Sequence, residues 1–284
     1  MAEARRNKKD LREMHQLIAE LVSLVGSADT IRKLIPYGDD AIAALRTYLL
    51  KGTPGSVYQP RQQAVFALAE LGARDVLFEY LRAKRKIEDP VIRGAEEWVE
   101  SSAARELARW IDETTFQFLL KLASKKFLTG GLEALGEFER PEAIPIFLRA
   151  LEDDFYRPAA EKALSRVLDM AQLFLIHAAT VPTLQEGYEP PSSVRRRQAA
   201  LKLLAETNLS PEHWLVLQPL LADEHHEIIV AIGVIASLIA PEEDRETAKR
   251  QIVFAYARSD WETAMELEAA FRRLNRKDKK GELE

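Results

Sequence analysis

The stretch GGLEALGEFERPEAIPIFLRALEDDFYRPAAEKALSRVL, Gly130 to Leu168, determines the fold prediction for this chain. It contains a short helical segment, a turn, a second helical segment, another turn, and then the first segment again. In the second segment, apolar residues recur at the i, i+3, i+4 and i+7 spacing of one helical stripe: Ile144, Phe147, Leu148 and Leu151. One hairpin of this size cannot bury such a stripe alone, so neighbouring hairpins must stack into a shared core.

Prolines mark the helix starts in this stretch. Pro141 and Pro158 each suit a first helical turn, where the N–H group that proline lacks is not needed. Pro145 comes only four residues after Pro141, so we expect an irregular helix start there. The pair Asp153-Asp154 is expected to end the second segment and to cap the helix that follows it.

The same features recur along the chain at multiples of 32 residues. Leucines keep this interval at Leu68, Leu132 and Leu164. Arginines keep it at Arg61, Arg93 and Arg157. A fixed period of this length is the sequence signature of a stacked helical repeat.

Three segments carry a family resemblance: EDPVIRGAEE (88–97), ERPEAIPIFLRALED (139–153) and RRQAALKLLAE (196–206). They resemble HEAT-like repeats, especially the short kind known from phycobilisome lyases, in which an Asp precedes a helix-opening Arg by four residues. Asp89 with Arg93 follows that pattern, whereas Asp223 is followed by Glu227 at the Arg position. The resemblance implies an all-α fold, a right-handed α-α superhelix (a HEAT-like solenoid) of about six to seven helical-hairpin repeats.

The predicted organisation has three parts. Residues 1–38 form an N-terminal helical cap with a frayed basic start, and residues 39–258 form the solenoid. A C-terminal capping helix and a charged tail occupy residues 259–284. Within the solenoid, Asp39 or Asp40 is expected to cap a helix, and a helical pair is expected over 90–100 and 103–111 with an added helix after it.

Composition limits the classes of function. The chain of 284 residues has no cysteine, which excludes disulfides, thiolate metal sites and thiol nucleophiles. Its net charge of −5 argues against a general polyanion binder. The first apolar run is interrupted by His15, Gln16 and Glu20, and no later run is long enough to span a membrane. These features predict a cytoplasmic protein with no membrane contact.

No pattern in the chain predicts catalysis, a cofactor or a metal. The only histidine cluster, His225-His226-Glu227, lacks the i, i+4 spacing of a helical zinc motif. No nucleotide-binding glycine motif occurs, and Gly130-Gly131 is better explained by close helix packing than by phosphate binding. Trp110 with Asp112 superficially fits the pair used by HEAT-like DNA glycosylases. If Asp112 proves to be buried in a capping hydrogen bond, that interpretation fails.

Basic clusters provide the alternative of nucleic-acid binding. If successive repeats align them, they would form a stripe able to contact phosphates. Lys and Arg near helix C-termini also complement the helix dipole, which explains the first two clusters but not the third. The candidate contacts with a partner or with phosphate are Arg82, Lys84, Arg85, Lys86, Lys125, Lys126, Arg195, Arg196 and Arg197.

An insertion interrupts the repeat at TVPTLQEGYEPPSS, residues 180–193. From Arg157 to Arg197 the spacing is eight residues longer than the 32-residue period, and prolines keep the insertion out of helix. Insertions in solenoids often lie on the binding face. Tyr188 and Glu189 are therefore candidate residues of a binding loop, although an idle surface insertion explains the sequence equally well.

The favoured functional hypothesis is a non-catalytic scaffold or adaptor that binds a protein or peptide on the solenoid surface. A nucleic-acid-binding HEAT-repeat protein, including one that resembles a DNA glycosylase, is the less favoured alternative. A helper subunit similar to the phycobilin lyases is the third, weakened by the absence of cysteine. The repeat pattern itself does not choose among these functions, because such folds serve many unrelated roles.

Overall fold

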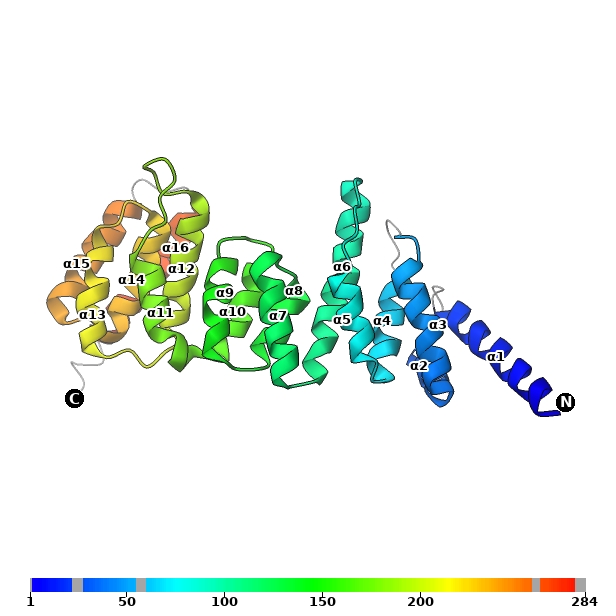
Figure 1. The fold of residues 1–284 in the computed structure, drawn as a ribbon. Helices are drawn as coiled ribbons and strands as arrows, with labels where there is room; N and C mark the ends of the chain where they lie inside the picture. The colour runs from blue at the N-terminus through cyan, green and yellow to red at the C-terminus, as the bar shows by residue number, and fades with distance from the viewer. Residues whose placement is uncertain (1, 22–27, 55–59, 257–260, 279–284) are drawn as a thin grey trace. The chain divides into compact units, whose positions relative to one another are not determined.

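The structure is a computed structural model that describes residues 2–21, 28–54, 60–256 and 261–278 (Figure 1). The chain is all-α, with 79% helix and no strand among the described residues. The all-α part of the fold prediction is therefore confirmed. Helices that follow one another in the chain pack on one another, which is the arrangement expected of a helical repeat.

The chain divides into two compact units, Met1–Phe138 and Glu139–Glu284. The division falls in the turn between α8 (Thr129–Gly136) and the 3-10 helix η3 (Pro141–Ala143). Glu139 in this turn has a positive φ of 51°. The boundary lies inside the range 39–258 that the sequence assigns to a single solenoid.

The first unit pairs helices in two layers. Its other elements are α1 (Ala2–Leu21), α2 (Ala28–Leu34), η1 (Ile35–Tyr37), α3 (Gly38–Lys51), α4 (Pro60–Glu70), α5 (Arg74–Arg82), α6 (Pro90–Glu106), η2 (Leu107–Arg109) and α7 (Glu113–Lys125). Helices α4, α6 and α8 pack in succession, and α5 lies beside α3. The rings of Phe78 on α5 and Phe118 on α7 approach to 4.4 Å between centroids, so α7 continues the second layer.

The second unit repeats this plan. Its elements are α9 (Ile144–Ala150), α10 (Arg157–Ser165), α11 (Leu168–Thr180), α12 (Pro191–Leu204), α13 (Pro211–Leu217), η4 (Gln218–Ala222), α14 (His226–Ile239), α15 (Glu242–Tyr256) and α16 (Trp261–Asp278). Helices α10, α12, α14 and α16 follow one another in one layer. Helices α9, α11 and α13 do so in the other, and we call these three together with α15 the outer helices.

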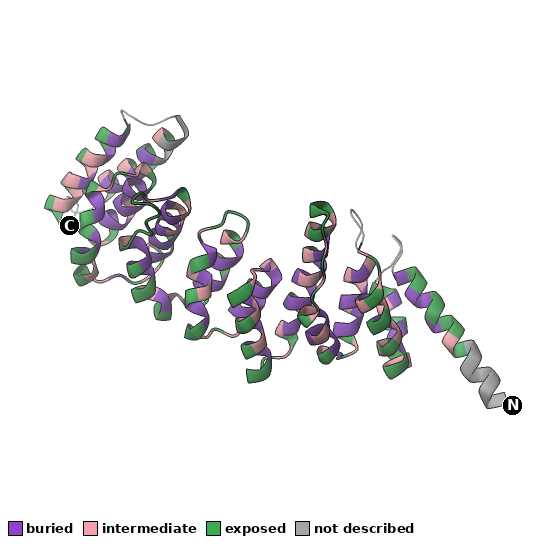
Figure 2. Cartoon of the chain, turned by 45° about the horizontal axis from the view of Figure 1, so that its top comes forward, coloured by how far each residue is buried: buried purple, intermediate pink, exposed green. Residues whose placement is uncertain are grey.

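Apolar side chains from both layers are buried between them, as the purple ribbon segments in Figure 2 show. Helix α14, which is apolar nearly all round in sequence, packs on α12, α13, α15 and α16. This packing on several sides agrees with the apolar character of the helix. Helix α16 packs on α14 and α15 and covers the end of the layer that α14 continues.

Close contact between α6 and α8 requires the first glycine of the pair in the organising stretch, Gly130. A Cβ atom at Gly130 would lie 2.0 Å from the carbonyl oxygen of Ser101. The Gly130 amide donates a hydrogen bond to the Ser101 hydroxyl at 2.8 Å. Gly130 therefore serves close helix packing, as the sequence interpretation proposed for the pair, whereas a Cβ atom at Gly131 would meet its nearest neighbours only at 3.6 and 3.7 Å.

Several local predictions hold. Pro145 follows a 3-10 turn and sits in the first turn of α9, so the irregular helix start is confirmed. Pro158 opens α10, and Asp89 caps α6 by accepting hydrogen bonds from the amides of Val91 and Ile92. The segment 51–60, with two glycines and two prolines, is also predicted to be a loop, and residues 55–59 of it lie outside the described residues.

Other local predictions are wrong. Residues 90–106 form one helix rather than ending at 100, because Ser102 donates to the Trp98 carbonyl and stays inside the helix. Helix α7, which was expected as an added helix, packs on α8. Neither predicted cap forms: α3 continues from a 3-10 turn at Tyr37 without a side-chain cap, and Asp153 instead accepts a hydrogen bond from the Phe155 amide. Helix α1 spans Ala2–Leu21, and the frayed basic start within residues 1–38 stays a prediction.

Candidate functional site

A buried charge cluster joins three helices of the first unit. Arg61 on α4 is 1% exposed and forms an ion pair with the buried carboxylate of Glu96 on α6. Tyr80 on α5 donates to the same carboxylate at 2.7 Å, and Arg85 contacts it at 3.1 Å. Burial lowers the pKa of Arg61 and raises that of Tyr80. All three partners converge on Glu96 from inside the fold, so this cluster stabilises the packing of α4, α5 and α6.

The first basic cluster, Arg82 to Lys86, is largely held by the protein itself. The Arg82 guanidinium lies over the rings of Phe78 and Phe118 at 5.4 and 5.1 Å from their centroids. Arg85 lies over the Tyr80 ring at 4.3 Å and pairs with Glu96. Lys86 and Glu88 form an exposed ion pair, and Lys84 is exposed to solvent.

The second basic cluster lies against the same helix, α6. Lys126 forms ion pairs with Glu97 at 3.1 Å and Glu100 at 2.7 Å, whereas Lys125 is exposed. Partial burial lowers the pKa of Lys126, but the hydrogen bonds and charges of Glu100 and Glu97 outweigh it and raise the pKa overall. The fold thus brings one residue of each of these two clusters, Arg85 and Lys126, to carboxylates of α6, whereas Lys84 and Lys125 are exposed.

The arginines of the third basic cluster, residues 195–197, contact acceptor groups inside the second unit. Arg195 donates to the Glu152 carbonyl, and Arg196 contacts the Glu152 carboxylate at 3.0 Å. Arg196 also donates to the carbonyl of Val181 at 2.7 Å. Arg197 is buried at 3% exposure. These three side chains are structural, and their charges face protein acceptors rather than a phosphate stripe.

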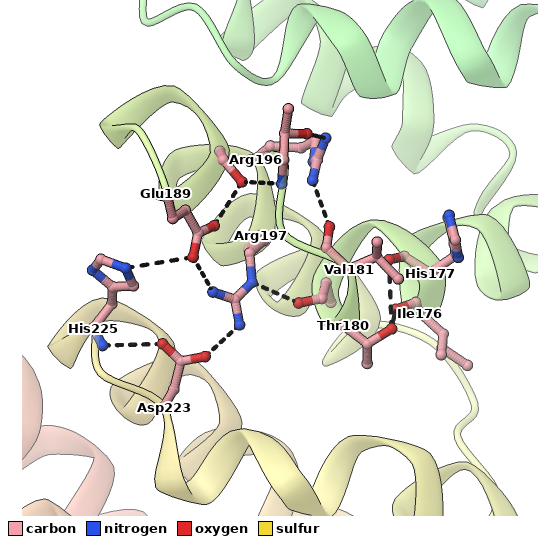
Figure 3. A network of polar contacts seen from close by, with 12 residues as sticks. Ile176, His177, Thr180, Val181, Glu189, Arg196, Arg197, Asp223 and His225 are labelled. Carbon is pink, nitrogen blue, oxygen red and sulfur yellow. Dashed lines mark hydrogen bonds and ion pairs between the residues drawn. The ribbon is translucent and has the colours of Figure 1, made fainter. Parts of the chain in front are cut away.

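The insertion at 180–193 is a built loop, anchored by Arg197 (Figure 3). Arg197 donates to the Ala179 carbonyl at 2.9 Å, contacts Glu189 at 2.7 Å and forms an ion pair with Asp223. Glu189 also accepts from the Ser193 hydroxyl at 2.6 Å and lies 3.4 Å from the His225 ring nitrogen. Glu189 therefore fastens the loop to the turn before α14, which is a structural role rather than a partner contact.

The tip of this loop is a two-residue hairpin turn. Gln185 and Tyr188 exchange backbone hydrogen bonds of 2.8 and 3.0 Å. Between them, Glu186 and Gly187 have φ angles of 51° and 88°, the pattern of a type I′ turn. Tyr188 remains exposed, in agreement with its candidacy as a contact residue.

Neither enzyme-like candidate gains support from its surroundings. Asp112 caps α7 by accepting from the Thr115 amide at 2.8 Å, and it forms an ion pair with Arg74. The hydrogen bond from Thr115 lowers the pKa of Asp112. Asp112 therefore forms the capping hydrogen bond that was expected to exclude a glycosylase-like role. Its side chain is 45% exposed, however, so it is not buried as that test also required. Among the described residues no group of three or more His, Asp or Glu side chains could hold a metal ion.

The second unit exposes a run of large apolar side chains on its outer helices. On α11, α13 and α15, these side chains point away from the layer that buries the rest of each helix. We call them the apolar strip; they are Met170, Leu173, Phe174, Leu215, Val216, Val253 and Phe254. Leu173 is 71% exposed and Leu215 is 72% exposed, although burying a leucine is worth about 2 kcal/mol.

The helices that carry the strip are neighbours in space. Helix α11 packs on α13, and Figure 1 shows both on the same side of α12 and α14. Trp214 on α13 donates to the carboxylate of Asp244 on α15 at 2.6 Å, which joins the third helix. Helices α11 and α13 thus pack directly on each other, and α15 adjoins them through this hydrogen bond at its first turn and through η4.

Two hollows lie in the second unit, one beside the outer helices and one on the opposite layer. A groove of about 360 Å³ lies between α9 and α11 at the base of the loop, and residues such as Leu148, His177 and Val181 line it. A second hollow of about 590 Å³ lies over α14 on the opposite layer, between Leu201 and Arg273. The first hollow adjoins the outer helices and enlarges the surface that they present.

No protein-family model matches the chain, and a search among curated proteins finds no match either. Within the described residues, no helix has both the length and the apolar character needed to cross a bilayer. Function is therefore argued from the geometry of the surfaces described above.

Proposed function

We propose that this chain is a non-catalytic HEAT-like solenoid, a right-handed α-α superhelix, that binds a protein partner on its outer helices. Pairwise packing of successive helices in both units supports the repeat architecture. The 32-residue period and the Asp89 cap support the resemblance to HEAT-like repeats. The cytoplasmic location stays a prediction from the sequence.

The observation that carries the binding proposal is the apolar strip. Isolated exposed apolar residues are ordinary, but a group of them on α11 and α13, which pack on each other, is typical of an interaction surface. The strip lies on rigid helices, so little conformational entropy is lost when a partner binds. A protein partner would remove leucine and phenylalanine side chains from water, which is the main driving force of association.

The nucleic-acid alternative loses its strongest support in the same structure. Arg195, Arg196 and Arg197 contact internal acceptors, and Lys126 contacts two glutamates. A phosphate would have to displace carboxylates that are already in place. The expected result with fluorescent duplex and single-stranded DNA and RNA at two salt concentrations is no binding. Tight binding that weakens steeply with salt would refute this choice.

The proposed function is tested with a variant of the strip. Leu173→Ser with Leu215→Ser removes two exposed anchors without disturbing the core, and Val91→Ser on α6 is the matched control because Val91 is also exposed. Each purified protein is cross-linked in a lysate of its source cells, and captured proteins are quantified. A binding module predicts a partner that the strip variant loses at least tenfold and that the control retains. An identical set of captured proteins for the unsubstituted protein, the strip variant and the control would refute the proposal.

A further inference from the structure

The second hollow, which lies over α14, is bounded by three consecutive helices of one layer. Helices α12, α14 and α16 follow one another in that layer, and α14 packs on both of its neighbours. Helix α14 supplies more of the lining than either neighbour, so it forms the floor, while α12 contributes Leu201 and Ala205 and α16 contributes Arg273. The hollow, of about 590 Å³, is therefore a groove along the middle helix of the layer.

Small residues and a close helix contact account for the space over α14. Ala231 and Ser237 on the floor and Ala205 on the wall carry too few side-chain atoms to fill it. On a different side of α14, a Cβ atom at Gly233 would lie 2.8 Å from the Ile252 side chain on α15. The missing side chain at Gly233 lets α14 approach the other layer closely. The groove is thus a consequence of how α14 packs.

The floor of the groove is apolar. Val230, Val234 and Leu238 recur at the i, i+4 and i+8 positions of one side of α14. The Ser237 hydroxyl on the same side donates to the Val234 carbonyl at 2.6 Å, so it needs no partner from a ligand. Leu238 is 44% exposed, and an apolar ligand would remove its side chain from water. The floor therefore favours an alkyl chain over a polar group.

Two cations without a carboxylate partner line the groove. Lys202 on α12 and Arg273 on α16 are exposed, and among the described residues neither forms an ion pair. Of the described residues that line the groove, only Glu206 is acidic, so positive charge exceeds negative charge there. The chain as a whole carries a net charge of −5, which repels anions. An anion bound in this groove would therefore be held by local contacts with the two cations.

The dimensions of the groove select a small ligand rather than a partner helix. The floor from residue 230 to residue 238 is roughly 12 Å long, and a helix laid along it would make contact over only about two turns. Pockets for small molecules have volumes of about 300–1,000 Å³ and are mostly apolar with a few polar groups. Since an extended chain advances by somewhat less than about 1.5 Å for each carbon–carbon bond, about ten carbons span the floor.

We propose that the groove over α14 binds a small amphiphilic carboxylate, an aliphatic chain of about ten carbons with one carboxylate group. The chain lies on Val230, Val234 and Leu238, and the carboxylate contacts Lys202 and Arg273. Lys202 also complements the dipole of α12 in its last turn, but Arg273 lies inside α16 and has no such role. This inference goes beyond the proposed function, because the site is on the layer opposite the outer helices and its ligand is not a protein.

Isothermal titration calorimetry of the full chain with three ligands tests the proposal. Decanoate has the proposed chain and head, hexanoate has four fewer methylene groups, and decanol lacks the charge. Every titration stays below the concentration at which the ligand aggregates. Decanoate is expected to bind at least about tenfold more tightly than hexanoate, because each buried methylene group strengthens binding. It should bind at least about threefold more tightly than decanol, because the alcohol forms no ion pair.

A charge variant separates local recognition from the net charge of the protein. The variant is Lys202→Gln with Arg273→Gln. Its matched control is Lys162→Gln with Arg272→Gln, which removes two exposed cations of the same unit that do not line the groove. The charge variant should lose at least about threefold in affinity for decanoate, and the control should lose less than about 1.5-fold.

A floor variant tests the place of the alkyl chain. Leu238→Gln makes the floor polar at a partly exposed position, and Leu184→Gln in the loop 180–193 is the matched control, since Leu184 is 60% exposed and does not line the groove. The floor variant should lose at least about threefold in affinity for decanoate, and the control should keep the affinity of the unsubstituted protein.

Four results would each overturn the proposal. Equal affinities for decanoate and hexanoate would exclude an apolar floor as the binding surface, and equal affinities for decanoate and decanol would exclude a role for the cations. Equal losses in the charge variant and its control would show that binding follows net charge alone. No heat of binding with decanoate below its aggregation concentration would overturn the proposal outright. The lysate cross-linking with the strip variant decides the proposed function separately.

Discussion

Replacing Arg197 with methionine should destabilise the second unit more than any exposed charge substitution. The Arg197 side chain is 4% exposed and neutralises two carboxylates, Glu189 and Asp223, that are each 11% exposed. Methionine fills a similar volume but leaves both carboxylates nearly buried without their cation. Removing one partner of a buried pair costs about 3–5 kcal/mol. For a unit of this size, that corresponds to a fall in Tm of roughly 6–20 °C.

Urea unfolding followed by circular dichroism measures this loss directly. The matched control is Arg272→Met, because Arg272 forms an i, i+4 pair with Glu268 and its side chain is 70% exposed. Exposed pairs of this kind are worth at most about 0.5 kcal/mol. Arg197→Lys should fall between the two, since lysine keeps the charge but cannot reach all the acceptors of the guanidinium.

Hydrogen exchange is a second measurement for the same variant, and it reports on the loop. Because Glu189 is fastened through Arg197, the variant should release residues 183–190, and hydrogen exchange at the Tyr188 amide should accelerate. A loss below about 1 kcal/mol, or one equal to that of Arg272→Met, would refute the assignment of this network as the anchor of the loop. Unchanged exchange at Tyr188 would refute it independently.

The other predictions concern single positions. Gly130→Ala should destabilise the chain by about 1–3 kcal/mol in urea unfolding, because the new Cβ atom would overlap backbone atoms. Gly94→Ala is the control and should stabilise the chain by about 0.5–1 kcal/mol, because nothing lies within 4 Å of its Cβ position. Equal changes in stability for the two variants would contradict the packing role of Gly130. Asp112 has a lowered pKa, so its contribution to stability is fully present above the ordinary pKa of 3.8 and is lost as pH falls through the pKa of the folded state. In thermal unfolding at decreasing pH, the difference in Tm between the unsubstituted protein and Asp112→Ala should therefore shrink. A difference in Tm that does not change with pH would contradict the capping role of Asp112. Glu186→Asn should raise Tm slightly, since asparagine tolerates a positive φ better, and a fall in Tm would argue against the type I′ turn.

Local periodicity allowed much of the fold to be predicted. The stripe from Ile144 to Leu151, the proline at 158 and the glycine at 130 all have effects within one or two helical turns, and the structure agrees with each. Where the local pattern was ambiguous, as at Ser101-Ser102, hydrogen bonds to the helix carbonyl and to Gly130 kept α6 continuous. That outcome depends partly on α8, which lies 29 residues further along the chain.

The roles of charged residues could not be predicted in the same way. Arg195 to Arg197 look in sequence like a basic cluster open to a partner, and Glu189 looks like an exposed loop residue. Their neutralisation depends on contacts with Glu152 and Asp223, which lie 44 residues before Arg196 and 26 residues after Arg197. No local pattern specifies such pairs.

The amino-acid sequence by itself determined that the chain is helical, where some proline-marked helices begin, and that thiol chemistry is absent. Those properties follow from side-chain spacing within a turn and from composition. The tertiary structure alone decided which charged side chains form contacts inside the protein and which apolar side chains remain exposed. The exposed apolar residues of α11 and α13 come together because these two helices, separated in sequence by α12, pack on each other.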